Sequence, residues 1–63
     1  MSDVFIRGRA PRGKGETVEV WGWVSNEQYW TNKGVAHLYC DDDVRGMAPV
    51  NVFIDSVDIE EVI

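Results

Sequence analysis

The sequence predicts an all-β protein, a small and strongly curled barrel of five short strands. Three segments carry this prediction because apolar and polar residues alternate along each of them: Thr17–Val24, Val35–Asp41 and Pro49–Asp55. Successive side chains of a β-strand point to opposite faces, so a period of two is typical of strands with one buried face.

Thr17–Val24 is the segment with the clearest pattern. One face would carry Val18, Val20, Gly22 and Val24, and the other face Thr17, Glu19, Trp21 and Trp23. The valine face suits a packed interior, whereas two tryptophans beside a charge suit a groove or a covered flank. A glycine inside a strand indicates a bend or the close approach of another backbone, so Gly22 is expected at such a point.

The remaining strands are placed by shorter patterns. Val4–Ile6 is expected to form a first strand that ends near Arg7, and Pro49 is expected at the first position of the fourth. Asp55–Asp58 is turn-forming through its Asp and Ser side chains. Residues 59–63 would form either a fifth strand, with Ile59 and Ile63 on one face, or a short helix; their β-branched residues favour the strand.

The segment Gly8–Gly15 holds three glycines and a proline, a composition that predicts a loop. It is also basic, and the candidate phosphate contacts are Arg7, Arg9, Arg12 and Lys14. Residues 1–14 carry a net charge of +3, whereas residues 15–63 carry −8. We favour a solvated loop over a phosphate-binding arm, because an acidic body repels nucleic acid.

Ser25–Gly34 is predicted to be a polar loop that Asn32–Gly34 closes as a turn, since Asn and Gly tolerate positive φ. Tyr29 and Trp30 lie within it. They would either fold back over the barrel, which is the commoner fate in a chain this short of core, or form part of a contact surface.

The third predicted strand, Val35–Asp41, and the turn after it contain the candidate metal-binding and catalytic side chains. Cys40 would share a face with Leu38 and is expected to be buried. Nothing marks His37 as a ligand or a base. The acidic turn Asp41–Gly46 contains Asp41, Asp42 and Asp43, but consecutive positions point apart and lack the spacing of a calcium loop. No metal site and no cofactor are expected.

Size and composition restrict the class of protein. The 63 residues are expected to form a single domain spanning 1–63, with a formal net charge of −5. Cys40 is the only cysteine, so no internal disulfide forms and the core depends on apolar and aromatic packing. The unpaired cysteine and the lack of an apolar leader predict a cytoplasmic protein without membrane contact.

Two families resemble parts of this pattern. The order of five short strands, with a 3₁₀ turn expected before the last one in Phe53–Val62, resembles SH3-like barrels. Val18–Ile54 is similar to the first three strands of OB-folds, such as the N-terminal domain of the exodeoxyribonuclease VII large subunit, through Gly22, Ser25, Asn26, Gly34 and Tyr39. The second resemblance implies single-stranded nucleic-acid binding on the sheet face.

Three functions fit the sequence, and none is enzymatic. The favoured one is a protein-binding module whose aromatic surface comprises Trp21, Trp23, Tyr29 and Trp30. The second is a single-strand binder that stacks bases on these aromatics. The third is an acidic inhibitor of a nucleic-acid enzyme; the small size would also fit an accessory protein of a phage or mobile element. The oligomeric state stays open.

Overall fold

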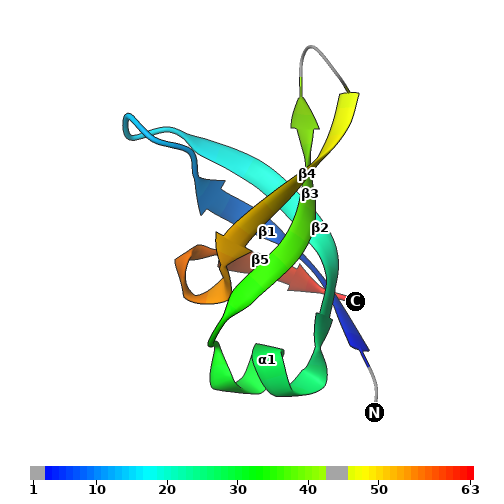
Figure 1. The fold of residues 1–63 in the computed structure, drawn as a ribbon. Helices are drawn as coiled ribbons and strands as arrows, with labels where there is room; N and C mark the ends of the chain where they lie inside the picture. Colours follow the sequence, from blue (N-terminus) through cyan, green and yellow to red (C-terminus); the bar gives the residue numbers. More distant parts are fainter. Residues whose placement is uncertain (1–2, 43–45) are drawn as a thin grey trace.

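A computed structural model describes residues 3–42 and 46–63 as an all-β fold (Figure 1). Its five strands are antiparallel, as the sequence predicts, and one short α-helix and one 3₁₀ turn interrupt them. The elements in chain order are β1 (Asp3–Pro11), β2 (Thr17–Ser25), α1 (Asn26–Thr31), β3 (Val35–Asp42), β4 (Gly46–Phe53), η1 (Ile54–Ser56) and β5 (Asp58–Val62).

The strands form one sheet in the order β4-β3-β2-β1-β5. The sheet is strongly twisted, and α1 lies at one of its ends, between β2 and β3 (Figure 1). Within the described residues β4 and β5 are its two edges and do not pair with each other. The sheet therefore curls around a core without closing into the complete barrel that the sequence led us to expect.

The core lies inside the curl and is built from the inward-facing residues of every strand. Its buried side chains are Ile6, Ala10, Val20, Val24, Ala36, Leu38, Cys40, Ala48, Ile54 and Val57. The predicted inward face of β2 and the burial of Cys40 beside Leu38 are thus confirmed. Burial of this apolar surface is the main favourable contribution to folding.

Gly22 marks a close approach, as predicted. A Cβ at this position would lie 3.0 Å from Leu38 Cδ2 and 3.3 Å from Leu38 Cα. The described pairing of β2 with β3 covers only Val20–Cys40 and Trp21–Tyr39, and it stops at this glycine. The missing side chain therefore lets Gly22 lie close against Leu38 of β3 at the point where the regular pairing of the two strands ends.

The loop predicted for Gly8–Gly15 is wrong over its first half, because β1 pairs with β2 as far as Pro11 and Thr17. Gly8 allows β5 to lie close to β1, because a Cβ on this residue would overlap the carbonyl oxygen of Asp58 in β5. Only residues 12–16 form the turn, closed by hydrogen bonds from Arg12 N to Glu16 O and from Glu16 N to Gly13 O, both 2.9 Å long.

The polar loop predicted after β2 begins with the helix α1. Ser25 caps it, since its Oγ accepts a hydrogen bond of 3.0 Å from Gln28 N. Asn32 ends it in the left-handed region at φ 57°, and Gly34 follows at φ 88°, which confirms the predicted turn. The Ser25–Gln28 spacing is a capping pattern and would have predicted this helix. No helix in the described ranges is long and apolar enough to cross a membrane.

Strand β4 starts three residues before the predicted position. Pro49 lies inside it, which sheets tolerate because β4 is an edge strand. The predicted turn Asp41–Gly46 is shorter as well, because β3 extends through Asp42 and β4 begins at Gly46. Asp43 and the centre of that turn lie outside the described residues.

The end of the chain is a strand, and the 3₁₀ turn expected before it is present as η1. The predicted common face of Ile59 and Ile63 is wrong. Gly8 lies opposite Ile59 whereas Arg7 lies opposite Glu61, so Glu60 is an extra residue that forms a bulge. A bulge reverses the alternation beyond it, and Ile63 consequently lies exposed on the other face.

Candidate interaction surface

Trp21 and Trp23 point away from the core, because β2 buries its valines on the opposite face. Trp23 is 63% exposed and Trp21 is half-buried. Trp23 packs edge to face against Phe5, its partner across the β1–β2 pair, with ring centroids 5.3 Å apart. We call the surface of outward-pointing side chains on the five strands the outer face.

A row of side chains crosses the outer face at Trp21. Arg7 of β1 and Tyr39 of β3 lie opposite Trp21, and Pro49 of β4 lies opposite Tyr39. On the far side Arg7 lies opposite Glu61 of β5 and forms an ion pair with it at 2.9 Å. The row therefore connects all five strands, with its apolar part over β2, β3 and β4.

The apolar part of the outer face extends well beyond the predicted tryptophans. Its apolar side chains are Phe5, Trp21, Trp23, Val35, Tyr39, Met47, Pro49, Phe53 and Ile63. Sequence reasoning noted the alternation in β3 and β4 but did not connect their outward residues with the tryptophans. Strand order places Trp21, Tyr39 and Pro49 side by side, because β2 and β4 both flank β3. The polar pair His37 and Asn51 separates Val35 and Phe53 from them.

The outer face contains a shallow hollow of about 310 Å³ lined by Phe5, Arg7, Glu19, Trp21 and Ile63. Ile63 is held there because its backbone N–H donates a 2.9 Å hydrogen bond to the carbonyl oxygen of Phe5. The β5 bulge brings Ile63 to this side, and no sequence pattern revealed the bulge.

Tyr29 and Trp30 belong to α1 and do not extend the row of aromatics. Tyr29 is partly buried against the core, as the capping alternative proposed, whereas Trp30 is 75% exposed. Their rings contact each other edge to face at 5.3 Å. The four aromatics predicted as one surface therefore fall into two groups, one on β2 and one on α1.

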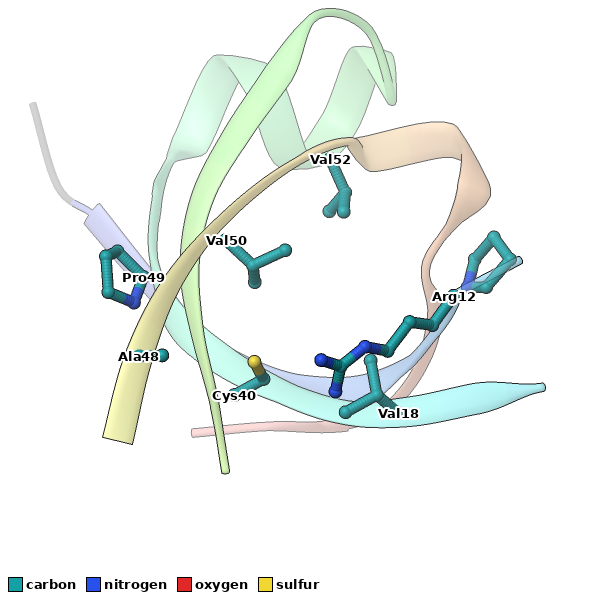
Figure 2. Close-up of a pocket in the computed structure, with 8 residues that line it drawn as sticks. Arg12, Val18, Cys40, Ala48, Pro49, Val50 and Val52 are labelled. Carbon is teal, nitrogen blue, oxygen red and sulfur yellow. The ribbon is translucent and has the colours of Figure 1, made fainter. Parts of the chain in front are cut away.

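The four predicted phosphate contacts do not form a single patch either. Strand alternation directs Arg7 and Arg9 to the outer face, where Arg7 pairs with Glu61 and the Nε of Arg9 lies 3.9 Å from Glu60 Oε2. Lys14 lies in the β1–β2 turn with φ 50°. The side chain of Arg12 extends into the open end of the curled sheet, which we call the mouth of the curl (Figure 2).

That mouth is a second hollow, of about 130 Å³. Its lining residues are Pro11, Arg12, Val18, Cys40, Ala48, Pro49, Val50 and Val52. Figure 2 shows the guanidinium of Arg12 directed toward Val18 and Cys40, with Val50 and Val52 on the opposite wall. The hollow is small and largely apolar, and it is the uncovered end of the core.

The polar side chains of the described outer face are exposed to solvent. His37 Nδ1 lies 2.7 Å from Asn51 Oδ1 across the β3–β4 pair. Because an amide oxygen only accepts, Nδ1 is the donor. Among the described residues no group of three or more His, Cys, Asp or Glu side chains is arranged to hold a metal ion.

Comparison of the chain with protein-family models, curated proteins and solved structures finds no significant match.

Proposed function

We propose that this protein is a small non-enzymatic binding module that engages a protein partner through the outer face. The observation that carries the proposal is the exposed apolar surface over β1–β4, where Phe5, Trp21, Trp23, Tyr39 and Pro49 lie on neighbouring strands. Exposed apolar patches of this kind on small proteins usually mark contact sites. Aromatic side chains are also enriched at the centres of protein interfaces.

The two edge strands, β4 and β5, are poorly suited to binding a partner, which favours binding through the outer face. An edge strand can bind a partner by adding another strand, and natural proteins prevent this with proline, charge and bulges. Pro49 removes a backbone donor from the β4 edge, and the β5 edge has the Glu60 bulge beside Glu61. A partner is therefore expected to lie on the side chains of the outer face.

We further propose that the fold is an SH3-like barrel that stays open between β4 and β5. The strand order β5-β1-β2-β3-β4 and the 3₁₀ turn η1 before β5 support this assignment. The OB-like alternative would need two further strands after Ile54, and the described chain has one, β5.

Single-stranded nucleic acid is the alternative partner, because Arg7 and Arg9 lie beside the aromatics and could hold phosphates. The carboxylates of Glu61 and Glu60 already contact these two guanidiniums. A phosphate would have to displace them on a chain of net charge −5. A protein partner is therefore favoured, both over nucleic acid and over mimicry of nucleic acid by the acidic residues.

The test is an affinity capture from cells of the source organism, with and without nuclease, using the wild type, Trp23→Ala and Trp30→Ala. The two substitutions are matched, since both indoles are largely exposed but only Trp23 lies on the outer face. We expect a nuclease-resistant protein partner that is lost with Trp23→Ala and kept with Trp30→Ala. Capture that nuclease abolishes, or that Trp23→Ala leaves intact, would contradict the proposal.

A further inference from the structure

The outer face also indicates the chemistry of its partner, provided that the proposed protein-binding function holds. We propose that it binds a cationic protein segment, with one apolar side chain in the hollow between Phe5, Trp21 and Ile63. A neighbouring Lys or Arg of that segment would pair with Glu19, which also lines the hollow.

The hollow suits one side chain of a partner better than a free small molecule. Its volume of about 310 Å³ is at the lower end of the range for small-molecule pockets, about 300–1,000 Å³, and it is shallow. Phe5, Trp21 and Ile63 provide apolar walls, and burying an apolar side chain against them is favourable. The walls also carry Arg7 and Glu19, so the charge beside the apolar side chain matters.

The charge of the outer face favours a cation at that position. Its described carboxylates are those of Asp3, Glu19, Asp41, Asp58, Glu60 and Glu61, and its guanidiniums are those of Arg7 and Arg9. These eight groups have a net charge of −4. Complementary charge speeds association and excludes partners of the wrong sign.

Glu19 is the carboxylate best placed to receive the cation. The register sets it opposite Arg9, but the side chain of Arg9 contacts Glu60 instead. Arg7, on the same hollow, is paired with Glu61. Within the described part of the chain neither ion pair uses Glu19, whose charge is therefore available next to Trp21.

Nuclear magnetic resonance of the full chain tests this proposal, because the indole N–H signals of Trp21, Trp23 and Trp30 report on separate places. The probes are three blocked pentapeptides at millimolar concentration: Gly-Lys-Leu-Lys-Gly, Gly-Glu-Leu-Glu-Gly and Gly-Lys-Gly-Lys-Gly. We expect the first to shift the Trp21 signal but not the Trp30 signal. Its dissociation constant should be on the order of tenfold below those of the other two.

Glu19→Gln supplies the test at the level of one residue, with Glu16→Gln in the β1–β2 turn as the matched control. Loss of one exposed ion pair should weaken the Lys-Leu-Lys probe about two- to fivefold, and the control should leave its binding unchanged. Equal weakening by both variants would show that the general charge of the chain holds the cation, and would overturn the assignment to Glu19.

Other results of the peptide experiment distinguish failure of the cationic-partner proposal from failure of the proposed protein-binding function. Equal binding of the Lys and Glu peptides at Trp21, or no binding of any peptide, overturns the cationic partner but leaves the capture experiment to decide on protein binding. If a ten-residue oligothymidylate shifts Trp21 and Trp23 while the peptides do not, both proposals fail.

Discussion

Gly8 and Asp58 lie so close together that no other residue fits at position 8. A Cβ on Gly8 would overlap the Asp58 carbonyl oxygen and lie 2.9 Å from Ile59 Cα. These atoms belong to the backbone and cannot rotate away. The glycine thus allows β5 to join the sheet beside β1 at the point where the register shifts.

Gly8→Ala is therefore expected to destabilise the protein by displacing β5. Overpacking of this kind typically costs about 1–3 kcal/mol, a large part of the roughly 3–9 kcal/mol expected for 63 residues. Urea denaturation gives the free energy of unfolding, and hydrogen exchange of the β5 amides reports on the strand. Gly13→Ala is the comparison, because a Cβ there meets no neighbour and only the positive φ opposes it. Equal effects of the two variants would contradict the close approach.

Ser25→Ala should lower the free energy of unfolding by about 1 kcal/mol, because it removes the acceptor that caps α1. Ser25→Asp keeps an acceptor at the same position and should retain most of the stability. Both are measured by urea denaturation. If alanine and aspartate behave alike, the hydrogen bond to Gln28 N does not stabilise the helix.

Leu38→Ala should destabilise the protein by about 2–5 kcal/mol, since Leu38 is fully buried and the substitution leaves a cavity. Trp23→Ala removes a larger but mostly exposed side chain and should cost less, although it loses the edge-to-face contact with Phe5. Thermal melting compares the two variants. Unfolding by Trp23→Ala to the same extent as Leu38→Ala would mean that this indole is part of the core.

Cys40 should react slowly with an aromatic disulfide reagent in native buffer and rapidly in guanidinium chloride. Its side chain is 6% exposed and lies among core residues at the narrow mouth of the curl. The rate of thiol release, followed by absorbance in both buffers, checks this. Equal rates in the two buffers would show that the mouth admits the reagent and that the thiol is accessible.

The sequence alone determined those features of the structure that depend only on residues close together in the chain. Alternation in β2 was enough to predict its buried valines, its outward tryptophans and the all-β class, because side-chain direction in a strand follows from backbone geometry alone. The buried position of Cys40 beside Leu38 followed in the same way. The helix α1 was also readable from Ser25 and Gln28, but the polar composition of the segment obscured the capping signal.

Tertiary structure decided which outward residues share one surface. Trp21, Tyr39 and Pro49 are far apart in the chain, and only the pairing of β2, β3 and β4 aligns them. Residues 8–11 belong to a strand because they pair with β2, and Gly8 leaves room for β5 on their other side. The bulge at Glu60 moves Ile63 into the hollow. These contacts join segments that are distant in the sequence and meet only after the chain has folded. The composition and periodicity of a single segment therefore cannot predict them.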